Sequence, residues 1–203
     1  MSVCSDVPDS ESRGKLLGEV AGFLVTLGYA MAAHGTKHKN AHTVAIGVAI
    51  QIAGDLSRGV HKLIENGNYY AAVALSRQLL EATQLIKYFQ AVPERGVFWL
   101  NATDSDMRSA RDFKPAALRQ ATQASDSMYS THCALGGHPR SMARLVLPGS
   151  PWRGRDDVVT LPRADGTTVQ ADLRSLILTD ALQHVYETVL ATIKGLTWMR
   201  CRY

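Results

Sequence analysis

Apolar residues recur at intervals of three and four over most of this chain, which is the spacing of one face of an α-helix. Residues 1–12 lack this periodicity and are polar, so they predict a frayed tail before a single domain over 13–203. The fold class expected is mostly α, an antiparallel bundle of four to five long helices. The pattern places long helices over residues 15–33, 41–65, 69–90, 115 towards 132, and 172–198, with a short helix over 94–101.

The ends of these helices follow from turn and cap residues. Gly35 is expected to stop the first helix, and Asn40 suits the cap of the second. Asn66-Gly67-Asn68 is a turn signal that closes a helical hairpin. Apolar residues at helical spacing predict the buried faces of the first and last helices, namely Leu16, Leu17, Val20, Phe23, Leu24, Leu27 and Met31, and Leu173, Leu176, Ile177, Leu182, Val185, Val189 and Ile193.

Two further patterns concern the last third of the chain. Asp180, Glu187 and Lys194 lie seven residues apart and predict the solvent-facing stripe of the last helix. Before that helix, β-branched runs at 158–161 and 167–169 flank Ala164-Asp165-Gly166, and Asp-Gly between such runs is typical of a hairpin. The sequence therefore predicts a short β-hairpin insertion near residues 145–170.

Composition narrows the class of protein. The 203 residues are 46% hydrophobic and 20% charged, which is ordinary for a globular protein and excludes wholesale disorder. Three separated cysteines make no disulfide framework, and the first dozen residues do not resemble a signal peptide. The most apolar run, 43–54, is shorter than the roughly 20 residues that span a bilayer. We therefore expect a cytoplasmic protein with no membrane contact.

Net charge leaves the partner open. A formal charge of +4 permits a polyanion such as RNA as a partner but does not require one. Trp152 lies among Arg153, Arg155 and Arg163, and an indole between arginines can stack on a base. Asp156 and Asp157 dilute this basic segment, so a tryptophan that anchors the loop is the alternative.

The segment 129–140 is the best candidate for a reactive site. It contains His132, Gly136, Gly137 and His138 before a proline, so the chain is expected to leave a helix at His138 and to present its imidazole. Two imidazoles there could share general-base and general-acid roles in phosphodiester cleavage. Arg140 and Arg144 would offset phosphate charge, while Cys133 points away from His132. The alternative is that His138 caps a helix end and His132 lies on a helix surface.

Two other clusters carry candidate chemistry. Arg77 and Glu81 lie four apart in the most apolar helix, where they form either a surface pair or an anion-binding arginine oriented by a glutamate. We predict that both are substantially buried and contact groups outside their own helix. His34, His38 and His42 are also spaced by four, which would align three metal ligands on a continuous helix. Gly35 and Asn40 argue against that continuity, so a solvated basic loop is expected.

Several short motifs resemble one family. They are Gly67-Asn68-Tyr69-Tyr70-Ala71-Ala72, Arg77-Gln78-Leu79-Leu80-Glu81, Phe113-Lys114-Pro115 with Leu118-Arg119, and Tyr129-Ser130 leading to Gly137-His138-Pro139. Over residues 45–140 the chain resembles uncharacterised bacterial helical proteins akin to the HEPN superfamily. The resemblance implies a helical bundle that often forms homodimers, and its ribonuclease members cleave RNA without metal, using an arginine four to six residues before a histidine.

The function expected from residues and resemblance together is RNA cleavage or processing, in a toxin or defence setting. His138 would be the general base and His132 the acid, with Arg77, Glu81, Tyr129, Arg140 and Arg144 around the substrate. No cofactor or metal is expected, because no compact cluster of ligands is visible. No arginine occupies the family spacing before His138, so a non-enzymatic bundle that binds a ligand or a partner protein is the alternative.

Overall fold

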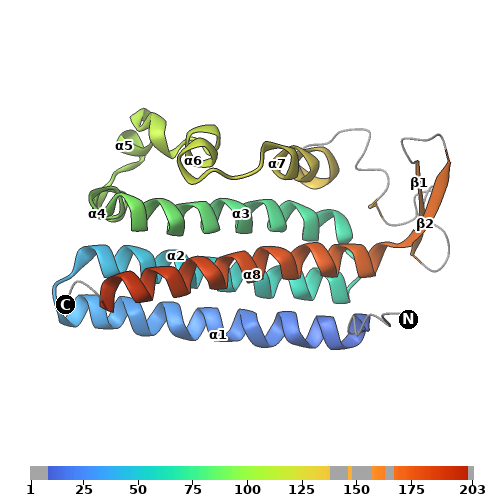
Figure 1. Cartoon of the computed structure of the whole chain (residues 1–203), viewed down its shortest axis with the longest axis horizontal. Coiled ribbons are helices and arrows are strands. Elements are labelled where there is room, and N and C mark those ends of the chain that lie inside the picture. Colours follow the sequence, from blue (N-terminus) through green and yellow to red (C-terminus); the bar gives the residue numbers. More distant parts are fainter. Residues whose placement is uncertain (1–8, 138–145, 148–156, 163–166, 201–203) are drawn as a thin grey trace, which may run out of the picture.

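Four long helices form the body of the protein: α1 (Ser10–Lys37), α2 (Ala41–Glu65), α3 (Tyr69–Ala91) and α8 (Leu173–Arg200). This computed structural model describes residues 9–137, 146–147, 157–162 and 167–200 (Figure 1). Helices α1, α2 and α3 are each antiparallel to the next, and α8 packs against all three. The predicted helical bundle is confirmed. Helix α1 already begins at Ser10, capped by Asp9, so the tail predicted to reach residue 12 is too long.

Close contact between α1 and α2 depends on glycine. A Cβ atom on Gly28 would lie 2.5 Å from the backbone nitrogen of Gln51, and one on Gly47 would lie 2.5 Å from that of Ala32. Gly35 was expected from the sequence to stop the first helix, and that prediction is wrong. Helix α1 continues to Lys37, and Gly35 is buried within its last turns. Its own Cβ would lie 2.8 Å from the backbone nitrogen of Val44, so this glycine serves the helix contact.

The two helical hairpins close with the same backbone motif. At the end of α2, Gly67 has a φ of 68°, and the N–H groups of residues 67 and 68 donate to the carbonyls of Ile64 and Leu63. At the end of α1, Lys39 takes the equivalent left-handed position with a φ of 53°. Asn40 then caps α2 by accepting from the Thr43 N–H at 3.0 Å, so the predicted cap is confirmed.

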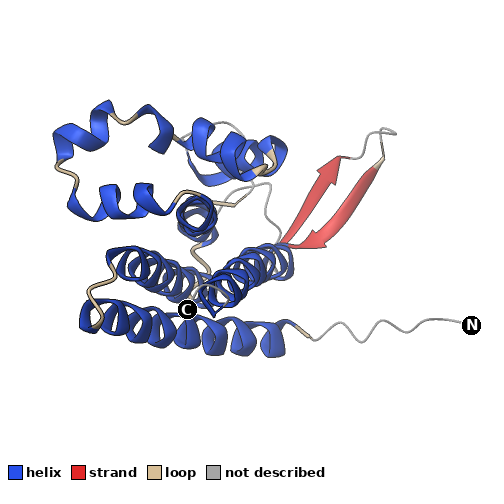
Figure 2. Ribbon diagram, turned by 60° about the vertical axis from the view of Figure 1, so that its left-hand side comes forward, coloured by secondary structure: helices blue, strands red, loops and turns tan. Residues whose placement is uncertain are grey.

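Shorter helices form a second layer over α3 (Figures 1 and 2). The single helix predicted from 115 towards 132 is wrong, because Gln123 adopts a left-handed φ of 54° and divides it. The Arg119 side chain bonds Asp126 across this break. In chain order the layer comprises α4 (Pro93–Asn101), α5 (Asp104–Ser109), η1 (Arg111–Phe113), α6 (Pro115–Thr122), α7 (Asp126–His132) and the π-helical turn η2 (Cys133–Gly137).

The predicted β-hairpin is confirmed by β1 (Val158–Pro162) and β2 (Thr168–Asp172), which pair antiparallel. Asp157 holds the base of this hairpin against the helical bundle. The Asp157 carboxylate accepts from the Tyr69 hydroxyl at 2.7 Å, and its carbonyl accepts from the N–H of Leu173 at 2.8 Å. The hairpin thereby fixes the start of α8.

The faces of α8 differ from the sequence prediction. Leu176 and Ile193 were expected in the core but are 44% and 52% exposed, and Leu16 and Phe23 on α1 are exposed as well. Asp180 and Glu187, predicted to face water, bond to side chains of other helices instead. The outward surface of α8 is therefore apolar over much of its length. Among the described helices, α1 alone is long and apolar enough to cross a membrane by length and composition, a property that core helices share.

Candidate functional site

His132 ends α7, and the turn that follows fixes its position. Gly136 in η2 packs against α3, where a Cβ atom would lie 2.8 Å from the Ala74 backbone nitrogen and 3.0 Å from the Tyr70 carbonyl oxygen. Only glycine allows this approach. Gly136 was predicted to be part of a helix break, but it continues the helical path in η2 and holds α7 against α3.

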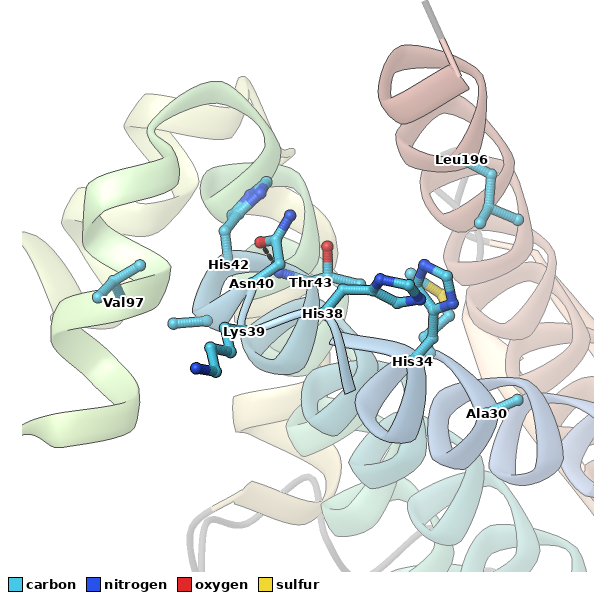
Figure 3. Close-up of a pocket in the computed structure, with 11 residues that line it drawn as sticks. Ala30, His34, His38, Lys39, Asn40, His42, Thr43, Val97 and Leu196 are labelled. Carbon is cyan, nitrogen blue, oxygen red and sulfur yellow. Dashed lines mark hydrogen bonds between the residues drawn. The ribbon is translucent and has the colours of Figure 1, made fainter. Parts of the chain in front are cut away.

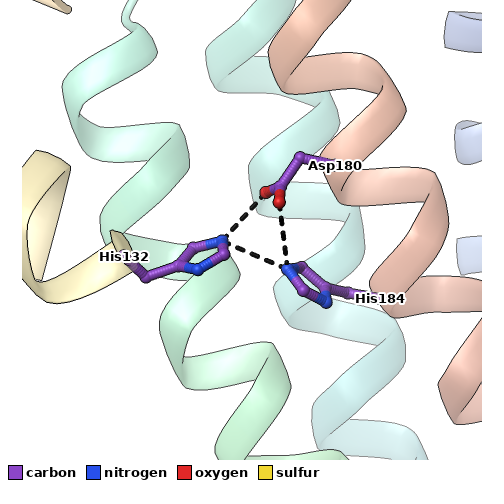
Figure 4. A group of neighbouring side chains, drawn as sticks. All are labelled: His132, Asp180 and His184. Carbon is purple, nitrogen blue, oxygen red and sulfur yellow. Dashed lines mark hydrogen bonds and ion pairs between the residues drawn. The ribbon is translucent and has the colours of Figure 1, made fainter. Parts of the chain in front are cut away.

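His132 meets two side chains of α8, Asp180 and His184 (Figure 4). Its Nε2 atom lies 2.9 Å from Oδ2 of Asp180 and 3.1 Å from Nε2 of His184. The His184 Nε2 atom is also 3.4 Å from Oδ1 of Asp180. His132 and His184 are 3% and 0% exposed, so His132 is not the surface residue that one sequence interpretation made it.

The electrostatics of this cluster favour an ionised Asp180. Burial raises the pKa of that carboxyl, but hydrogen bonds from His132 and His184 and their charge outweigh it, so the pKa of Asp180 falls far below the usual aspartate range. A carboxylate with a lone negative charge therefore faces two imidazole nitrogens.

The protons of the cluster cannot satisfy all three contacts. If both Nε2 atoms carry hydrogen and donate to Asp180, two donors lie 3.1 Å apart with no acceptor between them. If one Nε2 carries none, its lone pair faces the Asp180 carboxylate. Each arrangement leaves one repulsive contact. A cation among the three atoms would attract both lone pairs and the carboxylate.

A small cavity of about 170 Å³ adjoins the cluster. His132 and Asp180 contribute to its wall, so two of the three polar groups are reachable from it. The other lining residues are Thr131 and apolar side chains, including Val73, Leu135, Val146 and Val159. A volume of this size holds a few water molecules or a small, largely apolar molecule.

Arg77 and Glu81 form a separate cluster with Tyr129. The Arg77 guanidinium lies 3.2 Å from the Glu81 carboxylate and over the Tyr129 ring, and the Tyr129 hydroxyl donates to Glu81 at 3.0 Å. The side chains of Arg77 and Glu81 are 23% and 28% exposed, and their contacts with Tyr129 of α7 confirm the predicted contact outside their own helix. Burial raises the pKa of Tyr129, and the Glu81 charge adds to this. Arg77 lines an open groove, and His132 lines the cavity described above.

The three evenly spaced histidines do not converge. The rings of His34 and His38 lie 4.3 Å apart, but Nε2 of His42 is 2.9 Å from the Phe89 carbonyl oxygen (Figure 3). The break in the helix after Lys37 separates His42 from the other two, as the sequence analysis expected. These residues instead line a large cavity at the end of the bundle.

Several predicted residues lie outside the described part of the chain: His138, Arg140, Arg144, Trp152, Arg153, Arg155 and Arg163. Asp180 and His184 were not among the site residues predicted from the sequence. Their spacing of four on one helix was a visible signal, since it places a carboxylate and an imidazole on the same face. What the sequence did not show was that His132 packs against that face.

Comparison of the chain with protein-family models, with curated proteins and with solved structures finds no match. The resemblance to HEPN proteins therefore depends on the motifs alone and stays a prediction.

Proposed function

We propose that this protein binds a divalent transition-metal ion through Nε2 of His132, Nε2 of His184 and the carboxylate of Asp180. The observation that supports the proposal is the convergence of three ligand-type atoms whose contacts protons alone leave partly repulsive. Two imidazoles and one carboxylate suit zinc and iron-type ions. With bonds of about 2.1 Å, neighbouring ligand atoms lie about 3.0 to 3.4 Å apart, close to the separations of these three atoms.

The surroundings of His184 set the strength of binding. Its Nδ1 atom is buried and has no hydrogen-bond partner among the described residues. A metal at Nε2 requires the imidazole proton at Nδ1, where it would lack an acceptor. Since such outer partners contribute about 10- to 100-fold in affinity, we expect binding weaker than at a fully supported site of the same ligands.

The proposed site has the form of a catalytic metal centre. Three protein ligands leave a coordination position for water, and zinc lowers the pKa of bound water to about 7. The adjoining cavity would give such a water access to a small substrate, so hydrolysis is the class of reaction that the site would suit. The ribonuclease function remains a second prediction. Its base, His138, lies outside the described residues, and Arg77 lines a different cavity from His132.

Titration of the metal-free protein with Co²⁺ tests the proposal. Absorption bands of bound Co²⁺ should appear at one equivalent, and Asp180→Ala and His132→Ala should each weaken binding about 10-fold or more. His61→Ala is the matched control, because His61 also lies 3.3 Å from a carboxylate, that of Glu65, but belongs to no group of three ligands among the residues that the structure describes. Absence of bands, or equal loss in all three variants, would reject the site.

The same samples test RNA cleavage. Protein stripped with chelator and protein loaded with Zn²⁺ are incubated with a labelled RNA. Cleavage by the stripped protein would support the metal-independent mechanism that the resemblance implies. Cleavage only by the loaded protein, lost in Asp180→Ala, would place the reaction at the metal centre.

A further inference from the structure

A cavity of about 1000 Å³ opens at the end of the bundle where α1 ends and α2 begins. This is the upper end of the range that small-molecule sites occupy. Figure 3 shows the turn between the two helices on one side and Leu196 of α8 and Val97 of α4 on others. Four elements therefore surround a space large enough for an organic ligand.

The polar side of this cavity is basic. His34, His38 and Lys39 contribute to its wall, and no aspartate or glutamate is among the lining residues that the structure describes. None of these three side chains has an ion pair within the described ranges. The imidazoles can donate hydrogen bonds in either protonation state, and the lysine ammonium is a full positive charge. A ligand with a negative group would be attracted here.

The arrangement of the basic groups also favours an anion. The rings of His34 and His38 have centroids 4.3 Å apart, so one negative group can lie beside both imidazoles. Lys39 occupies the left-handed position that Gly67 takes in the matching turn. Lysine adopts this left-handed conformation at a steric cost that glycine does not have. What lysine adds at this position is its charged side chain.

The rest of the cavity wall is largely apolar. Met31, Val97 and Leu196 contribute to it from α1, α4 and α8, and Ala30 and Ala41 add small apolar surfaces. Burial of a hydrocarbon group against these side chains would be favourable. A basic turn beside an apolar wall suits an amphiphile better than a bare inorganic ion.

We propose that this cavity binds a small organic anion whose carboxylate or phosphate contacts His34 and His38, with Lys39 adding positive charge at the same turn, and whose apolar part packs against Met31 and Leu196. The site is independent of the proposed metal centre, which lies between α7 and α8.

Calorimetric titration of the chelator-treated full chain with octanoate and octyl phosphate tests this proposal. Chelator treatment prevents binding of the probes through metal at His132. At least one probe should bind, and the preferred one identifies the anionic group. Octanol has the apolar part without the anionic group, and inorganic phosphate has the anionic group without the apolar part. Each should bind at least about 10-fold more weakly than the preferred probe.

The variant Lys39→Gly with His38→Gln removes two basic groups while giving residue 39 the amino acid best suited to its backbone. It should keep its thermal midpoint and lose about 10-fold or more in affinity. Lys62→Gln, which removes a positive charge from the opposite end of α2, is the control and should bind as the parent. Equal binding by the double variant and the parent would overturn the proposal, as would octanol binding as tightly as octanoate. His34→Gln, which leaves the turn untouched, gives the same comparison if the double variant loses its fold.

Discussion

The same substitution at two glycines of α1 should change stability in opposite directions. Gly22 and Gly28 both lie inside this helix, where alanine is favoured over glycine by about 1 kcal/mol. A Cβ atom on Gly22 would meet only the Arg58 guanidinium, at 3.9 Å. That is ordinary contact with the end of a flexible side chain. Gly22→Ala should therefore raise the free energy of unfolding by about 0.5 to 1 kcal/mol.

Gly28→Ala meets backbone instead. Its Cβ atom would lie 2.5 Å from the Gln51 nitrogen and 2.6 Å from the Gly47 carbonyl oxygen. Carbon contacts are normally about 3.5 to 4.0 Å, so α1 and α2 must separate by about 1 Å. The separation loosens the packing of Leu24 and Ile50, which are fully buried. Overpacking costs about 1 to 3 kcal/mol, and a clash with backbone falls in the upper part of this range because backbone cannot move aside as a side chain can. After a gain of about 1 kcal/mol in helix propensity, we expect a net loss of about 1 to 2 kcal/mol.

Thermal and urea unfolding of the two variants, followed by circular dichroism, measure this difference. A gap of about 1.5 to 3 kcal/mol corresponds to roughly 3 to 12 °C between the two midpoints for a chain of this length. Gly22→Ala thereby controls for helix propensity within the same helix. Midpoints that move together, in either direction, would refute the close contact of α1 and α2 at Gly28.

Two further predictions concern acid stability and assembly. The pKa of Asp180 is depressed in the folded protein, so its contribution is present above about pH 4 and is lost as pH falls towards the folded pKa. Asp180→Ala should thus lower the free energy of unfolding by about 1 to 2 kcal/mol at pH 5 to 7, and urea titrations should show the deficit shrinking below pH 4; a constant deficit would contradict the bonds to His132 and His184. The predicted homodimer should use the exposed apolar face of α8, so Tyr186→Lys with Ile193→Lys should convert a dimer to a monomer in sedimentation. Binding of the parent to lipid vesicles, abolished in this variant, would instead assign the face to a membrane.

Local signals predicted the two ends of α2 and the start of α3. Asn40 and Asn68 cap the helices that follow them, and Gly67 ends α2, because these residues act through their own backbone and the next turn. The errors arose where a distant contact decides the conformation. Gly35 stays helical because Val44 lies against it, and Gln123 turns left-handed although glutamine carries no turn signal.

The candidate site was less accessible from sequence for a similar reason. Asp180 and His184 were visible as a pair on one helix face, but His132 precedes Asp180 by 48 residues. Its approach depends on Gly136 packing against α3, and no periodicity in the sequence encodes that contact. The sequence analysis therefore paired His132 with His138, its nearest histidine along the chain.

The polar cluster on α8 is difficult to explain by stability alone. Burial of His132 and His184 beside a carboxylate costs desolvation free energy, and apolar residues of similar volume often make a core at least as stable. The same helix places Leu176, Tyr186 and Ile193 at its surface, so apolar side chains are available to it in excess of what the described core uses. Charged and polar side chains in the core of this helix favour a chemical role for the cluster. Apolar side chains on its outer face favour a partner that covers that face. The metal and sedimentation experiments test these two inferences separately, because Asp180 and Tyr186 differ in burial and in partners.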